Sequence, residues 1–167
     1  MGVGNLRWIA LACLAAACAP RDLIVEAPIE NPATEGCRAS SDADFEGEGE
    51  MKLRRYLAWL ARAHGTPVAL APWDVSLAIV RGEPHLGPTG VQAGEVSCNA
   101  HDYRITVYRD ALTGRRLAVT YHTIAHEVRH VVQIRRDKLD CESSKGDRAA
   151  YEREADDFAR SVVPACK

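Results

Sequence analysis

Two histidines one helical turn apart, with a glutamate beside the first, are the residues of this 167-residue chain best suited to chemistry. They belong to the pentapeptide His126-Glu127-Val128-Arg129-His130. On an α-helix, residues i and i+4 share a face, so both imidazoles can bind one Zn²⁺ while Glu127 reaches a coordinated water. Zinc lowers the pKa of such a water from about 15.7 to about 7, and Glu127 can take its proton for attack on a peptide carbonyl. The motif therefore predicts zinc-dependent peptide hydrolysis.

The sequence around the motif predicts a helix that buries one side. Apolar residues recur at helical spacing between Leu117 and Ile134, and the two histidines lie beside this stripe. The same pentapeptide can occur by chance on a solvated helix, where its histidines and glutamate are surface residues. A buried helix with a polar edge is what a metal site in a cleft requires, so the pattern favours the metal site.

A third ligand is expected from a second helix, because catalytic zinc usually takes three protein ligands and keeps one position for water. The segment after His130 is apolar and lacks the third histidine of the metzincin pattern. An acid-rich helix is predicted from near Asp147 to just before Pro164. Glu152 in this helix is the expected ligand, and Asp156, one turn later, is expected to accept the free N–H of a zinc-bound imidazole.

Glu154 and Asp157 compete with Glu152 as ligands, since spacing alone does not exclude them; as ordinary surface charges they would have no role. The apolar positions of this helix leave Glu152 and Asp156 flanking its buried side, whereas Glu154 points away. Those apolar positions are Ala155, Phe158, Ala159 and Val162.

Together, segments 123–130 (Thr-Ile-Ala-His-Glu-Val-Arg-His) and 152–159 (Glu-Arg-Glu-Ala-Asp-Asp-Phe-Ala) resemble the small gluzincin metallopeptidases, particularly the ImmA/IrrE group. The resemblance covers about residues 51–164. It implies an α+β, zincin-like fold with an N-terminal helix, a small mostly antiparallel sheet, an active-site helix and a C-terminal ligand helix. It also implies Glu152 as the third zinc ligand. The chain has Arg129 where that group usually has Gly, and its Asp156 matches the E-x-x-x-D pattern of other gluzincins.

The elements expected before the motif helix are a helix over residues 51–64 ended by Gly65 and Pro67, strands near 75–79 and 103–107, and a loop over 82–94. We expect Tyr103–Tyr108 to be the edge strand along which an extended peptide could pair. For the donor to a tetrahedral oxyanion, His122 is the first candidate because it continues the ligand face one turn before His126. The other candidates are Tyr151, His101 and Tyr108.

Residues 1–18 predict export. Arg7 precedes an apolar run over residues 8–17, which has the length of a signal-peptide core. The segment Leu14–Cys18 resembles a bacterial lipobox, whose cleavage leaves Cys18 as a lipidated first residue. Ala19 after it favours the outer membrane of a Gram-negative cell, facing the periplasm. The alternative is a secreted protein in which Cys18 is incidental.

Removal of the leader and lipidation of Cys18 would leave four cysteines, which in an oxidising compartment predict two disulfides with three alternative pairings. These are Cys37, Cys98, Cys141 and Cys166. Zinc binding by cysteines is disfavoured because the chain has no C-x-x-C pair. Residues 19–49, rich in Pro, Ala and acidic residues, are expected to form a tether, and residues 50–167 the metallopeptidase domain.

The sequence as a whole predicts an exported zinc metalloendopeptidase that acts on a peptide or protein substrate and reaches the membrane through its lipid. A net charge of −2 without a basic stripe gives no support to nucleic-acid binding. The main alternative is an envelope binding or assembly lipoprotein with a structural or vestigial zinc site. Glu127 favours the enzyme, because a structural site does not need it. A small toxin or immunity component is a further possibility that no residue distinguishes.

Overall fold

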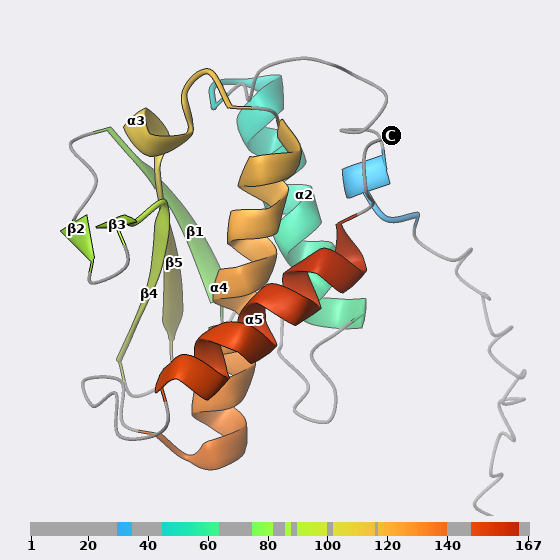
Figure 1. Cartoon of the computed structure of the whole chain (residues 1–167). Coiled ribbons are helices and arrows are strands. Elements are labelled where there is room, and N and C mark those ends of the chain that lie inside the picture. The colour runs from blue at the N-terminus through green and yellow to red at the C-terminus, as the bar shows by residue number, and fades with distance from the viewer. Residues whose placement is uncertain are drawn as a thin grey trace, which may run out of the picture.

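A computed structural model describes residues 30–34, 45–63, 75–81, 86–87, 90–99, 102–115, 117–139 and 148–163. Within them the chain is an α+β structure with four helices and a small three-stranded mixed sheet (Figure 1). The elements are α2 (Glu48–Ala63), β1 (Val75–Val80), β2 (Leu86–Gly87), β3 (Gly90–Val91), β4 (Gly94–Cys98), β5 (Tyr103–Tyr108), α3 (Arg109–Leu112), α4 (Leu117–Asp137) and α5 (Arg148–Val162).

The three long helices α2, α4 and α5 confirm the helices that the spacing of apolar residues predicted. Helix α2 begins at Glu48 and buries its apolar stripe, and the acidic residues of its first turn suit the positive end of the helix dipole. Helix α4 continues past the predicted Ile134 to Asp137. Helix α5 starts one residue after the predicted Asp147 and buries Ala155, Ala159 and Val162.

The sheet differs from the predicted, mostly antiparallel one. Its strand order is β1-β5-β4, with β1 parallel and β4 antiparallel to β5. A short connection joins β4 to β5, which favours antiparallel pairing. Between β1 and β5 the chain passes through β2, β3 and β4. Strand β1 lies on the side of β5 opposite β4 and runs parallel to β5. The sheet is therefore mixed.

Two expectations about the strands were wrong. Tyr103–Tyr108, expected at the edge, is the central strand β5, because both of its sides are paired. The edge strand beside α4 is β4, which the sequence analysis missed. Its sequence Gly-Glu-Val-Ser-Cys is poor in β-branched and aromatic residues, so its strand signal is weak. The segment expected to be a loop over residues 82–94 also contains β2 and β3.

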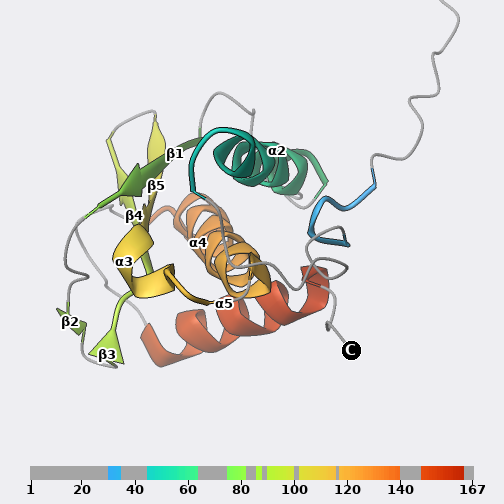
Figure 2. The ribbon, with the colours of Figure 1, turned by 90° about the horizontal axis from the view of Figure 1, so that it is seen from above.

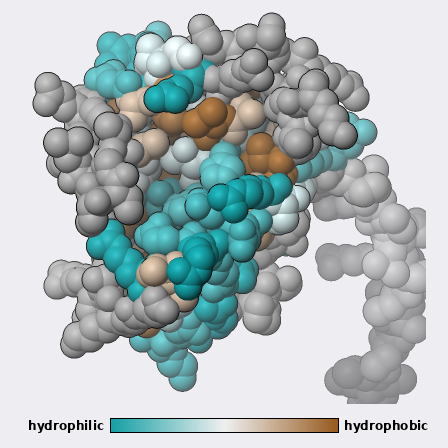
Figure 3. Space-filling view, in the orientation of Figure 1, coloured by the Kyte–Doolittle hydropathy of each residue, from teal (hydrophilic) through white to brown (hydrophobic). Residues whose placement is uncertain are grey.

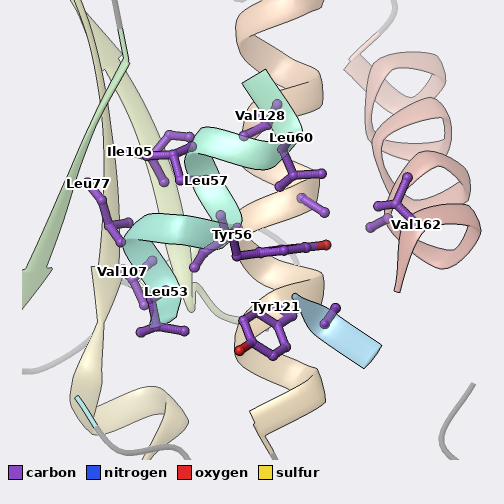
Figure 4. Close-up of a cluster of buried hydrophobic side chains, with 14 of the residues drawn as sticks. Leu53, Tyr56, Leu57, Leu60, Leu77, Ile105, Val107, Tyr121, Val128 and Val162 are labelled. Carbon is purple, nitrogen blue, oxygen red and sulfur yellow. The ribbon is translucent and has the colours of Figure 1, made fainter. Parts of the chain in front are cut away.

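Helix α4 is the central element of the fold. Helices α2 and α4 cover one face of the sheet, and α5 crosses α4 on the side away from the sheet (Figures 1 and 2). Apolar side chains from α2, β1, β5 and α4 meet between these layers (Figure 4). The largest fully buried ones include Tyr56, Tyr121, Leu53, Leu60, Ile105 and Ile124. This core fixes the position of α4, which carries the predicted motif.

Part of the segment expected to be a tether packs against the domain. Ala33 and Phe45 are 1% and 5% exposed and belong to the core. The side-chain amide of Asn31 donates a hydrogen bond of 2.7 Å to the carbonyl of Val162 at the end of α5. These residues therefore extend the packed unit to the N-terminal side of residue 50.

Several predictions concern residues outside the described ranges. The leader and Cys18 lie there, as do Cys37, Cys141, Cys166 and His101. Cys98 is disulfide-bonded, and the pairing of the cysteines stays a prediction. In the described ranges no helix combines the length and the apolar character needed to cross a bilayer.

Candidate metal centre

Three donor atoms from α4 and α5 converge. The Nε2 atoms of His126 and His130 are 3.0 Å apart, and Glu152 Oε2 lies 3.2 Å from the first and 3.7 Å from the second. Among the described residues this is the group of His, Cys, Asp and Glu side chains that could hold a metal ion. The three predicted ligands thus lie together at the crossing of the two helices.

These separations fit a tetrahedral zinc site. Zn–N and Zn–O bonds of about 2.0–2.2 Å at tetrahedral angles place neighbouring donor atoms about 3.3–3.6 Å apart. The three separations, 3.0, 3.2 and 3.7 Å, lie on both sides of that range. The imidazole side chains are 18% and 20% exposed, whereas the carboxylate side chain is 45% exposed. The centre is therefore walled by α4 and open to solvent beside Glu152.

Asp156 lies where the sequence analysis expected it. Its Oδ1 is 3.0 Å from Nδ1 of His126, so the carboxylate can accept the Nδ1–H hydrogen bond. A proton on Nδ1 leaves the lone pair of Nε2 directed at the other two donors.

Gln133 is the hydrogen-bond acceptor for the Nδ1–H of His130, as Asp156 is for that of His126. Gln133 was not among the predicted site residues. Its Oε1 lies 2.7 Å from Nδ1 of His130 and accepts that N–H. Both imidazoles then turn unprotonated Nε2 atoms toward each other at 3.0 Å. Two lone pairs and a carboxylate oxygen at such distances repel one another unless a proton or a cation lies between them. The donor set is therefore chemically suited to a cation. Burial lowers the pKa of His130, which favours its neutral, ligating form.

Glu127 is the buried carboxyl of the site, with 7% of its surface exposed. Burial is the main cause that raises its pKa to about 8, and the carboxylates of Glu152 and Glu95 raise it further. A carboxyl with a raised pKa beside a cation site can exchange a proton near neutral pH, as general acid–base catalysis requires.

Gly94 at the start of β4 lets the strand approach Glu127. A Cβ atom at this position would lie 2.7 Å from Cγ2 of Thr123 and 3.0 Å from Oε1 of Glu127. Any larger residue would push the strand or the carboxyl aside. The sequence analysis missed this role because it placed Gly94 in a loop over residues 82–94, whereas Gly94 begins β4.

The competing acids lie outside the donor set. Glu154 Oε1 accepts hydrogen bonds from Arg129 at 2.5 and 2.8 Å and from Arg136 at 2.8 Å. Asp157 is 77% exposed and pairs with Arg160 at 3.0 Å. In Figure 3 hydrophilic side chains lie along the lower and central part of the front face, where α5 runs in Figure 1. Glu154 was expected to point away, but it faces α4 and joins the two helices because Arg129 and Arg136 bind its carboxylate. Asp157 is a surface charge.

The oxyanion-donor candidates differ in placement. His122 is partly buried one turn before His126; burial is the main cause that lowers its pKa, and the charge of Asp156 opposes this. Tyr151 donates its hydroxyl to Asp137 at 3.0 Å, away from the three donor atoms. Tyr108 is buried on β5 and hydrogen-bonds to Glu95.

A comparison of the chain with models of protein families, with curated proteins and with solved structures finds no match.

Proposed function

We propose that this chain is a zinc-dependent metallopeptidase of the gluzincin type with a zincin-like fold. One observation carries the proposal: the donor atoms of His126, His130 and Glu152 converge, with the buried carboxyl of Glu127 next to them on α4. The resemblance of the two helical segments to the gluzincins supports the same assignment. A purely structural metal site would gain nothing from Glu127, whose burial raises its pKa.

His126, His130 and Glu152 would hold Zn²⁺, which when bound activates a water and polarises a peptide carbonyl. Glu127 would be ionised when such a cation is bound nearby, and in that form it would serve as the base. Glu127 then takes a proton from the attacking water and returns it to the amide nitrogen as the C–N bond breaks. His122 is the candidate donor to the oxyanion, since it lies on the same helix and is partly buried.

The edge strand β4 is the candidate position for the substrate backbone. It lies at the edge of the sheet beside α4, and its first residue, Gly94, lies against Glu127. An extended peptide that adds to this edge by main-chain hydrogen bonds would bring its scissile carbonyl near the site. This assignment replaces β5, whose two sides are both paired.

The test combines metal analysis with proteolysis. We expect one zinc per chain and hydrolysis of an unstructured protein or of a mixed peptide library. Glu127→Gln should retain the zinc and lose hydrolysis. Glu152→Gln should lose both, whereas Glu154→Gln, on the same helix, is the matched control and should retain its zinc.

Two results would contradict the proposal. Equal zinc in wild type and Glu152→Gln would mean that the third ligand lies elsewhere. Full zinc without hydrolysis of any peptide, in wild type and Glu127→Gln alike, would instead favour the envelope binding or assembly protein.

We further propose that the enzyme is exported and anchored through a lipid on Cys18, on the basis of the leader and the lipobox-like segment. Labelled palmitate should enter the wild-type protein and not Cys18→Ser, which should leave the membrane fraction. Equal membrane association of both proteins without label would contradict lipidation.

A further inference from the structure

Gln133 of α4 connects both ligand helices. It is 1% exposed, and both ends of its amide have partners. Its Oε1 accepts the Nδ1–H of His130 at 2.7 Å, and its Nε2 donates to the backbone carbonyl of Tyr151 at 3.0 Å. One amide thus contacts the second histidine on its own helix and the residue before Glu152 on α5.

Only one orientation of this amide satisfies both partners. If oxygen and nitrogen exchanged places, an NH₂ group would face an imidazole and an oxygen would face the carbonyl of Tyr151. Because an unpartnered buried polar group is costly, the carbonyl of Tyr151 fixes the amide. The amide in turn keeps the proton of His130 on Nδ1, and Nε2 is left free to bind a cation.

The contact also fixes the backbone of α5 next to Glu152. The peptide carbonyl that accepts from Gln133 immediately precedes this ligand. Two residues beyond Glu152, the carboxylate of Glu154 accepts hydrogen bonds from Arg129 and Arg136 on α4. Glu152 is therefore held on both sides, while the ion pairs of Glu154 join the helices independently of Gln133.

We propose that Gln133 is a positioning residue that sets the geometry of His130 and Glu152 together and thereby couples cation binding to the docking of α5 on α4. This rests on the proposed function, in which both side chains are metal ligands. Gln133 touches no substrate; it acts through the two ligands.

Two variants separate this role from simple packing. Gln133→Met keeps the volume and loses both hydrogen bonds. Gln133→Glu keeps an oxygen that can accept from His130, and in its protonated form it can also donate to the carbonyl of Tyr151. Val132→Ala is the matched control, because Val132 is also 1% exposed on α4 and its truncation removes packing without removing a hydrogen bond.

The affinity for zinc, measured by competition with a chromogenic chelator on the folded proteins, is the first readout. Gln133→Met should bind zinc about 10–100-fold more weakly than wild type. Gln133→Glu and Val132→Ala should bind close to wild type. The visible absorption spectrum of bound Co²⁺ is the second readout and should change shape only in Gln133→Met, because a general loss of stability does not alter ligand geometry.

Unchanged zinc affinity and an unchanged Co²⁺ spectrum in Gln133→Met would overturn the inference and leave the peptidase proposal standing. A wild-type protein that binds neither zinc nor Co²⁺ would overturn both. If Gln133→Met does not fold, the protonation of the His130 ring nitrogens in wild type tests the inference instead. It is measured by ¹⁵N NMR with chelator present. A proton on Nδ1 of His130 supports the inference whether or not Nε2 is also protonated, and an unprotonated Nδ1 overturns it.

Discussion

The burial of Glu127 predicts how the stability of the protein depends on pH when a chelator is present. The variant Glu127→Gln replaces a titrating side chain by a neutral one of the same shape. In the folded protein the pKa of Glu127 is raised from 4.5 to about 8, chiefly by burial. The folded state therefore holds a proton that the unfolded state releases between these two values. Wild type should lose stability as the pH rises through this window, and Glu127→Gln should not.

The size of the effect follows from the two pKa values, about 8 and 4.5. Each pH unit between them is worth about 1.4 kcal/mol, so the free energy of unfolding of wild type falls by about 5 kcal/mol in total. The stability gained by Glu127→Gln over wild type should be under about 1 kcal/mol at pH 5, about 3 kcal/mol at pH 7 and about 5 kcal/mol above pH 8.

Urea unfolding in the presence of a chelator, followed by circular dichroism at pH 5, 7 and 8.5, measures this difference. Glu154→Gln is the control of opposite sign. Hydrogen bonds from Arg136 and Arg129 hold the pKa of Glu154 below its usual range. Its contribution is present above its unfolded pKa and is lost as the pH falls below it. Glu154→Gln should therefore be less stable than wild type by a nearly constant amount from pH 5 to 8.5, and the difference should shrink in a further measurement at about pH 3.

A stability difference between Glu127→Gln and wild type that stays constant from pH 5 to 8.5 would refute the reasoning. It would mean that Glu127 has the same pKa in the folded and unfolded chain. Saturating Zn²⁺ should reduce the slope, because a neighbouring cation favours the carboxylate.

Three further predictions concern single side chains. Gly94→Ala should lower hydrolysis and leave zinc binding intact, because the added Cβ meets Thr123 and Glu127 but none of the three donors; kinetics and metal analysis on one preparation would check this. Asp156→Ala should weaken zinc binding about 10–100-fold in chelator competition, since the Nδ1–H of His126 loses its acceptor. Tyr56→Phe should stabilise the fold by about 1 kcal/mol in urea unfolding, because the buried Tyr56 hydroxyl has no hydrogen-bond partner among the described residues.

The sequence predicted the helices and the placement of their polar residues well, because both depend on local spacing. The i, i+4 relation places His126 and His130 on one face of any helix. The apolar side of α5 predicted that Glu152 lies near α4, but it wrongly placed Glu154 away from α4, where that side chain is paired with Arg129 and Arg136. The order of these elements in the chain also gave the α+β class.

The sheet topology and the closest neighbours of the site were harder to predict, because they depend on tertiary pairing. Nothing local to Tyr103–Tyr108 says that two strands flank it. Gly94 gains its role only from the approach of α4, which places Thr123 against it. Gln133 lies in an apolar run, where a polar residue could have been recognised as needing buried partners. Its spacing from His130, three residues, was the available signal.

The two sides of α4 explain how one helix can supply both the proposed ligands and the proposed proton carrier. Glu127 lies against β4, where burial raises its pKa. His126 and His130 lie on the edge toward α5, where Asp156 and Gln133 contact their outer nitrogens. A rotation of α4 that improved the packing of one side would displace the other. The apolar core and the polar contacts with α5 must therefore be satisfied by the same rotation of α4 about its axis. We infer that this shared requirement fixes the three donor atoms and the carboxyl of Glu127 relative to one another.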